Sequence, residues 1–238
     1  MFDFHERVVI VTGAAGDLGQ AVSRAFLSTE ARMVLVDHKP DRLQRLYPSL
    51  VGSTDHVLAT SVDQAEPAPV QKMVDQVLAQ FGQIDVLVNT VGGYRGGTPV
   101  HEMSLDDWEY MLNLNARTAF IISRAVVPAM LAQDYGKIIH IGSRAALQGS
   151  ARAPAYSVAK SAVVRLTESL SGEVKQQGIN VNCVLPGTID TPENRASRPN
   201  ADHSRWVAPE ALADVIMFLA SDAARAIHGA AIPVYGPG

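Results

Sequence analysis

The chain has 238 residues, 47% of them hydrophobic, so it is long enough to bury a core and to form one large domain. Its 20 basic and 24 acidic residues give a formal net charge of -4, which excludes a general attraction to nucleic acid or to an anionic membrane surface. The one cysteine, Cys183, allows no disulfide within the chain, and the first apolar run is too short for a signal peptide or a membrane span. We therefore expect a cytoplasmic protein whose partner is a small molecule.

Apolar runs rich in β-branched residues recur along the chain and predict strands. They cover 8–12, 32–37, 56–60, 84–89, 137–142, 179–186 and 230–235. Most of these runs are apolar at successive positions, as expected for strands that are buried on both faces of a parallel sheet. Segments of helical period lie between them. We therefore predict an α/β fold, with 1–238 as a single Rossmann-type domain: a doubly wound parallel sheet of about seven strands with helices on both faces.

The first predicted strand runs into a glycine-rich turn that is typical of a dinucleotide site. Gly13, Gly16 and Gly19 open the next helix, where backbone N–H groups and the helix dipole attract a pyrophosphate. The second strand ends at Asp37, where a carboxylate can bind ribose hydroxyls and would repel a 2′-phosphate. The pattern favours NAD(H) as the cofactor, and the basic pair His38–Lys39 keeps NADP(H) as the weaker alternative.

A tyrosine and a lysine four positions apart suggest acid–base chemistry. Tyr156 and Lys160 lie in a segment of helical period, so their side chains share one face. A nearby ammonium favours the phenolate, which would let Tyr156 act as a general acid or base near neutral pH. Ser143 ends a predicted strand at the carboxyl edge of the sheet and can hydrogen-bond the same substrate oxygen. These residues predict proton exchange with a carbonyl or alcohol as hydride is transferred.

Over essentially its whole length the sequence resembles the short-chain dehydrogenase/reductase family. The features that carry the resemblance follow the family order: the TG of the glycine turn, Asp85, Asn89, Asn115, Ser143, Tyr156 with Lys160, and Pro186–Gly187. The resemblance implies that Asn115, Ser143, Tyr156 and Lys160 form a catalytic tetrad. It further implies that Lys160 binds the nicotinamide ribose, that Asn115 supports a proton-relay water, and that the protein is a homotetramer or homodimer.

The resemblance and the glycine turn together define an expected cofactor-binding set. Its members are Gly13, Gly16, Asp17, Leu18, Gly19, Asp37, Ser61, Val62, Asn89, Gly92, Tyr156, Lys160, Pro186, Gly187 and Thr188. Two members depart from the family's commoner residues, because Asp17 stands where glycine is usual and Ser61 where many members carry aspartate. Both departures could weaken nucleotide binding. A nucleotide-binding sensor or scaffold with little catalysis is therefore one alternative function.

At several departures the chain resembles one branch of the family, dihydropteridine reductase. It shares that branch's form of the glycine turn, the GG-aromatic-x-GG run at 92–97, and the AALxG run after Ser143. That branch lacks the catalytic serine and the tetrad asparagine, whereas Ser143 and Asn115 are present here. The leading hypothesis is thus an NAD(H)-dependent oxidoreductase acting on a carbonyl or secondary alcohol. An NADH-dependent quinonoid dihydropteridine reductase is the alternative enzyme.

The segment 188–206 lacks a clear periodic pattern and is dense in Pro, Asn, Asp and Ser. A loop of that length in a compact domain is usually functional, so we expect it to cover the substrate. The expected substrate contacts combine aromatic walls with polar groups, and no metal ion is expected. They are Tyr94, Arg95, Asn194, Arg195 and Trp206.

Overall fold

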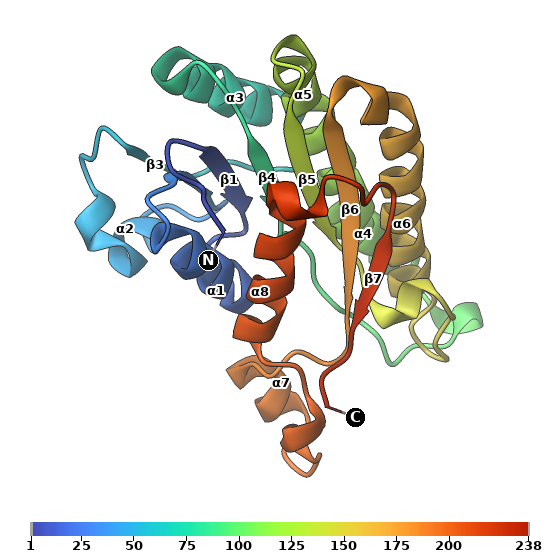
Figure 1. Ribbon diagram of the computed structural model, residues 1–238. Coiled ribbons are helices and arrows are strands. Elements are labelled where there is room, and N and C mark those ends of the chain that lie inside the picture. Colours follow the sequence, from blue (N-terminus) through green and yellow to red (C-terminus); the bar gives the residue numbers. More distant parts are fainter. Residues whose placement is uncertain (1, 238) are drawn as a thin grey trace.

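The computed structural model describes residues 2–237 and contains one seven-stranded sheet in which every pairing is parallel (Figure 1). The strands are β1 (Val8–Thr12), β2 (Arg32–Val36), β3 (His56–Ala59), β4 (Val86–Asn89), β5 (Gly136–Ile141), β6 (Ile179–Pro186) and β7 (Ala231–Val234). Their order, β3-β2-β1-β4-β5-β6-β7, reverses between β1 and β4, as in doubly wound sheets. The predicted fold is therefore confirmed.

Helices cover both faces of this sheet. They are α1 (Asp17–Leu27), α2 (Arg42–Leu46), α3 (Pro67–Phe81), α4 (Leu105–Leu112), α5 (Thr118–Ala132), α6 (Pro154–Val174), α7 (Pro192–Ser197) and α8 (Pro209–Ala220). Helices α1 and α8 pack side by side on one face, while α3, α5 and α6 cover the other (Figure 1). Among residues 2–237, no helix is both long and apolar enough to cross a membrane.

The central strands explain why their sequences are apolar at successive positions. Every residue of β1, β4, β5 and β6 is buried. In β1, Val9 and Val11 pack with α1 and α8, whereas Val8 and Ile10 pack with α3 and α5. A strand covered by helices on both sides needs apolar residues at odd and even positions alike.

A π-helical turn over Asn113–Arg117 joins α4 to α5. The sequence pattern predicts one uninterrupted helix here, and the axis does continue, but the turn widens around Asn115. Such π turns inside α-helices occur frequently at functional sites. Asn115, the expected tetrad asparagine, lies within this widened turn.

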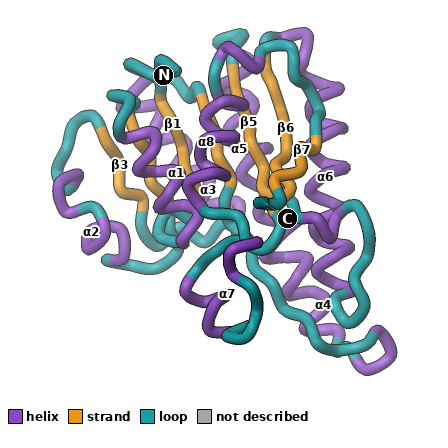
Figure 2. The backbone as a smooth tube through the Cα atoms, turned by 60° about the horizontal axis from the view of Figure 1, so that its bottom comes forward, coloured by secondary structure: helices purple, strands orange, loops and turns teal. Residues whose placement is uncertain are grey.

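The segment 188–206 contains more regular structure than its sequence predicts. Helix α7 and a 3-10 turn (His203–Arg205) lie within it, and Figure 2 shows α7 beyond the carboxyl ends of the strands. The Thr191 side chain accepts a hydrogen bond from Asn194 N at 3.2 Å, and Pro192 occupies the first helical position. These are the usual signals of a helix start. A parallel bridge between Ile189 and Val207 closes the segment at its base.

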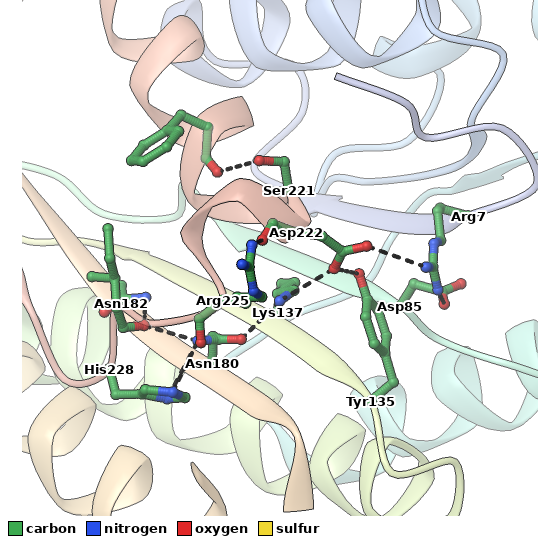
Figure 3. Close-up of polar contacts among 12 residues, drawn as sticks. Arg7, Asp85, Tyr135, Lys137, Asn180, Asn182, Ser221, Asp222, Arg225 and His228 are labelled. Atoms are coloured by element: carbon green, nitrogen blue, oxygen red, sulfur yellow. Dashed lines mark hydrogen bonds and ion pairs between the residues drawn. The ribbon is translucent and has the colours of Figure 1, made fainter. Parts of the chain in front are cut away.

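A charged cluster joins the amino ends of the strands, at the edge of the sheet opposite the glycine turn (Figure 3). Arg7 donates to Asp85 at 2.9 Å, and its guanidinium carbon lies 4.1 Å from the centre of the Tyr135 ring. Lys137 Nζ lies 3.5 Å from Asp222 Oδ1, which also accepts a hydrogen bond from the Tyr135 hydroxyl at 3.1 Å. The members of this cluster are paired with one another. We therefore assign this charged cluster a role in stability.

Candidate active site

The turn between β1 and α1 has the geometry of a phosphate-binding turn. Gly13 has a φ of +64°, and a Cβ on Gly19 would lie 2.1 Å from Gly13 O, so neither position tolerates a side chain. The N-cap residue Gly16 offers no side-chain cap to the first turn of α1. The N–H groups of that turn can therefore bind an anion. Asp17 is exposed at the start of the helix, whereas Leu18 is buried.

The carboxyl end of β2 presents a buried acid next to this turn. Asp37 is only 3% exposed, and its carboxylate accepts a hydrogen bond from Lys39 N at 2.9 Å. His38 Nδ1 lies 3.7 Å from the same carboxylate oxygen. Ser61 is exposed with a φ of +58°, and the Val62 N–H donates to Asp37 O at 3.2 Å. Val62 can therefore offer a nucleotide base its carbonyl but not its N–H.

Two threonines fasten the glycine turn to the end of β4. The Thr12 hydroxyl donates to Asn89 Oδ1 at 2.6 Å, and the Thr90 hydroxyl donates to Thr12 O at 2.6 Å. A Cβ on Gly13 would lie 3.0 Å from Thr90 Oγ1. These contacts fix the glycine turn between β1 and α1 relative to the segment after β4, which contains Gly92.

Asn115 ties the segment after β4 to the π turn. Its Oδ1 accepts a hydrogen bond from Gly93 N at 3.2 Å, and its Nδ2 donates to Gly93 O at 3.1 Å and to Met111 O at 3.0 Å. The side chain is buried. Because both amide hydrogens are used, the side chain holds the Gly92–Gly93 backbone in place and has no free donor for a relay water.

Lys160 lies at the meeting point of α6, β5 and this segment. Its Nζ donates to Ile141 O at 2.8 Å, and burial lowers the pKa of the ammonium to about 8. A Cβ on Gly92 would lie 2.8 Å from Asn115 Oδ1 and 2.9 Å from Lys160 Nζ. Only a glycine lets the backbone pass so close to both polar groups.

Tyr156 lies one helical turn before Lys160 on α6, beside Ser143. Burial raises the pKa of the phenol, the hydrogen bond with Ser143 opposes that rise, and the neighbouring Tyr94 adds to it. In the protein alone, the pKa of Tyr156 therefore lies above its ordinary value, with burial as the largest cause. Ser143 Oγ also accepts a hydrogen bond from Ala145 N at 3.2 Å, which fixes the serine at the end of β5.

The end of β6 completes the carboxyl edge. Pro186 is its last residue, and Gly187 N donates to Val234 O at 3.0 Å. A Cβ on Gly187 would lie 2.8 Å from Tyr235 O. Thr188 O accepts a hydrogen bond from Val207 N at 2.9 Å. The first residue of the segment 188–206 is therefore bound to the residue that follows the segment.

Two of the five expected substrate residues come from the segment after β4. Tyr94 lies against Tyr156, with ring centroids 5.0 Å apart and ring planes at 83°. Arg95 forms an ion pair with Asp107 and places its guanidinium 4.3 Å from the centre of the Tyr110 ring.

The other three expected substrate residues make contacts within their own segment. Arg195 binds Asp190 through two hydrogen bonds of 2.5 and 2.7 Å, and Asn194 Nδ2 donates to Ile189 O at 2.8 Å. The Trp206 ring packs on His203, with centroids 4.4 Å apart. Of the five, Tyr94 is thus the residue that the structure brings to the tetrad.

Sequence reasoning overlooked His140, which is fully buried in β5 next to Lys160. The available signal was a single histidine inside the otherwise apolar run KIIHIG. It also overlooked Arg152, which anchors the Tyr94 segment. Arg152 Nε donates to Gly97 O, and Gly97 N donates to Arg152 O, both at 2.7 Å.

The chain is similar to known dehydrogenases over most of its length. The family model described as short chain dehydrogenase matches residues 7–202. D-threitol dehydrogenase of Mycolicibacterium smegmatis is 33% identical over 246 residues, covering 99% of this chain and 94% of that protein. Meso-2,3-butanediol dehydrogenase of Serratia marcescens is 32% identical over 241 residues, covering 98% of this chain and 94% of that protein. The solved structure of gox2181 is 29% identical with a TM-score of 0.89, covering 98% of this chain and 95% of that one. No match specific to dihydropteridine reductase accompanies them.

Proposed function

The chain belongs to the short-chain dehydrogenase/reductase family, and we propose that it uses NAD(H) to interconvert a secondary alcohol and the corresponding carbonyl. The observation that carries the proposal is the convergence of the tetrad. The Gly92 backbone passes against Asn115 and Lys160. Tyr156 lies beside Ser143 and one turn before Lys160 on α6.

Each tetrad member has a distinct role in this proposal. Tyr156 exchanges the proton with the substrate oxygen, and Ser143 hydrogen-bonds that oxygen as its charge changes. Lys160 supplies a buried positive charge one turn from the phenol, and Asn115 fixes the Gly92–Gly93 backbone that passes against Lys160. When bound, the nicotinamide supplies or accepts the hydride. A cationic nicotinamide would lower the raised pKa of Tyr156 and so assist alcohol oxidation.

The preference for NAD(H) rests on Asp37. Its buried carboxylate at the end of β2 can accept hydrogen bonds from ribose hydroxyls, and it would repel a 2′-phosphate. The cofactor would lie along the carboxyl edge, with its pyrophosphate at the Gly13–Gly19 turn and its nicotinamide end near Gly92, Lys160 and Gly187. The glycine geometry of the turn fits such a group, because side chains there would fill the space needed for close backbone approach.

We further propose that the substrate is a small, uncharged, hydroxylated compound. The two arginines expected to contact substrate, Arg95 and Arg195, are paired with Asp107 and Asp190, so neither offers an unpaired charge to an anionic substrate. The names of two relatives, D-threitol dehydrogenase and meso-2,3-butanediol dehydrogenase, refer to small neutral alcohols. A homodimer or homotetramer remains our proposal for the assembly.

Quinonoid dihydropterin is the second candidate substrate, because Tyr94 is 63% exposed and its ring lies beside Tyr156. A flat, uncharged ring could stack there. Pterin reduction that survived the change Ser143→Ala would favour this alternative over alcohol chemistry. A nucleotide sensor, the third possibility, would bind NADH without turning over any substrate.

The proposal is tested by steady-state assays with NAD and with NADP against matched panels of substrates. One panel contains neutral diols and polyols with their ketones, a second contains carboxylated or thioester analogues, and a third contains quinonoid pterins. We expect turnover in the first panel, with a higher kcat/KM for NAD. Binding of NADH without turnover in any panel would contradict the enzymatic role.

A further inference from the structure

His140 lies in a buried row of polar residues and cysteine that crosses the sheet, on the strand that ends before Ser143. In the parallel register it is paired with Asn89 of β4 on one side and with Cys183 of β6 on the other. Its ring reaches toward α5, where Nε2 lies 3.1 Å from Ser123 Oγ. Lys160 closes the same layer from α6, because its Nζ bonds the carbonyl of Ile141, the residue after His140.

The hydrogen bonds of Ser123 fix the tautomer of this histidine. Ser123 Oγ lies 2.7 Å from Ala119 O, a distance that places the hydroxyl hydrogen between them. A serine has one hydrogen to donate, so its oxygen must accept the hydrogen bond from His140. The imidazole therefore carries its proton on Nε2. Nδ1 is left as a bare acceptor, and this buried atom has no hydrogen-bond partner.

The surroundings keep His140 neutral. Burial, with a smaller contribution from the Lys160 ammonium, lowers the pKa of His140 to about 4. Cys183, on the next strand, is also uncharged, since burial raises the pKa of its thiol to about 11. Ser123 and Asn89 carry no charge. The charged group next to this layer is Lys160, whose Nζ bonds the carbonyl of the residue after His140.

We propose that His140 is a positioning residue for Lys160: Ser123 holds it in the Nε2–H form, which leaves an unpaired Nδ1 lone pair on the residue next to the carbonyl that binds the ammonium. A lone pair there stabilises the positive charge of Lys160, whereas an N–H or a second cation would oppose it. The catalytic meaning of this arrangement rests on the proposed function, in which Lys160 acts as a cation. The arrangement itself can be measured without turnover.

The tautomer is tested first, by long-range ¹H–¹⁵N NMR of the imidazole nitrogens. We expect an unprotonated Nδ1 and a protonated Nε2 across pH 5 to 9, and the change Ser123→Ala should mix the two tautomers. Detection of an Nδ1–H form in the unmodified protein, or titration of His140 near its ordinary pKa, would overturn the proposal. So would a Ser123→Ala spectrum that still shows the pure Nε2–H form.

The effect on Lys160 is tested by titrating ¹³Cε-labelled lysine, with Lys160→Arg used to assign the signal. His140→Leu removes both ring nitrogens, whereas His140→Asn keeps one donor and one acceptor. We expect the Lys160 midpoint to move to lower pH in His140→Leu and to stay near the parent value in His140→Asn. The exposed His101 provides the control, because His101→Asn should leave the midpoint unchanged.

An identical Lys160 titration in the parent, His140→Leu, His140→Asn and His101→Asn would overturn the proposal even if turnover is observed. This test is therefore separate from that of the reaction. Should His140→Leu fail to fold, the Lys160 titration in Ser123→Ala decides the matter, because mixed tautomers should move the Lys160 midpoint to lower pH and an unchanged midpoint would overturn the proposal.

Discussion

Tyr94 stands edge-on to Tyr156, with ring centroids 5.0 Å apart and ring planes at 83°. The hydroxyl of Tyr94 lies so close to Gly96 that a Cβ at that position would be 2.3 Å from it. The reciprocal hydrogen bonds between Gly97 and Arg152 hold the end of this segment. The ring that would exchange the proton is therefore partly covered by an aromatic residue on a glycine-rich segment. This contact influences both the acidity of Tyr156 and its access to substrate.

Removing the Tyr94 ring should make Tyr156 more acidic. Burial is the main cause of the raised pKa of Tyr156, and Tyr94 adds to it, so Tyr94→Ala should lower this pKa. We expect the Tyr156-dependent limb of the kcat/KM profile for alcohol oxidation to move to lower pH, and KM to rise as the aromatic wall is lost. Tyr94→Phe keeps the ring but removes the hydroxyl, so it separates burial by the ring from the electrostatic effect of the Tyr94 hydroxyl. A profile that is unchanged in Tyr94→Ala would show that the contact has no influence on the acid–base group.

Cofactor choice should follow the charge at position 37. Asp37→Asn keeps the size of the side chain but removes the charge that would repel a 2′-phosphate. We expect the ratio of kcat/KM for NADP to that for NAD to rise by roughly tenfold or more, because loss of one close charge repulsion is worth about 1–2 kcal/mol. Asp41→Asn is the control, because Asp41 is exposed and lies in the same loop between β2 and α2. If Asp37→Asn retained the parent ratio, the assignment of Asp37 to the ribose would be wrong.

Lys160 should lower stability while it supports activity. Its pKa in the folded protein is about 8, below the ordinary 10.5, so at neutral pH folding must bury a charge. Between about pH 8 and 10.5 the unfolded chain still binds this proton and the folded protein does not, so the contribution of Lys160 becomes less unfavourable as pH rises through that window. Lys160→Met should therefore raise the free energy of unfolding at pH 7 by up to about 3 kcal/mol.

The higher free energy of unfolding of Lys160→Met should disappear near pH 11. The variant should lack turnover at every pH. Denaturant unfolding followed at pH 7 and at pH 11 provides the measurement. A variant that is less stable than the parent at pH 7 would contradict this explanation of the buried lysine.

The charged cluster at the opposite edge should affect stability and leave the reaction unchanged (Figure 3). Asp85 is buried, binds Arg7 at 2.9 Å, and accepts a hydrogen bond from Val8 N at 2.8 Å. Asp85→Asn should lower the free energy of unfolding by about 2–3 kcal/mol, since a charge-assisted hydrogen bond is lost and Arg7 loses the closer of its two acidic partners. Asp222→Asn should cost less, about 1 kcal/mol or below, because the Asp222 side chain is 65% exposed. KM and kcat measured below the unfolding transition should match the parent in both variants.

Much of the fold could be predicted from residue patterns alone. Strands such as β1 and β6 are apolar at every position because helices cover both faces, and this pattern gave their bounds without error. The glycine turn was also recognisable, since Gly13 and Gly19 occupy positions where a side chain would clash. Patterns of this kind arise from local backbone geometry and burial, which the sequence records directly.

Side-chain pairings were harder to predict because they depend on neighbours distant in the chain. Arg95 and Arg195 were expected to contact substrate, but each has an acidic partner that periodicity could not identify. The raised pKa of Tyr156 likewise depends on how deeply the folded protein buries the phenol. Helix α7 was overlooked although Thr191 and Pro192 signal its start, because a helix of 6 residues is too short to show a period.

The central claim is that Tyr156 exchanges the proton in an NAD-dependent alcohol–carbonyl reaction. Its most direct test compares Tyr156→Phe with the parent at saturating NAD, using the best substrate from the neutral alcohol panel and measuring kcat, together with NADH binding by fluorescence. We expect Tyr156→Phe to bind NADH within a few-fold of the parent and to lose at least about a hundredfold in kcat, the range expected for one general acid–base group. Retention of full turnover by Tyr156→Phe would contradict the account.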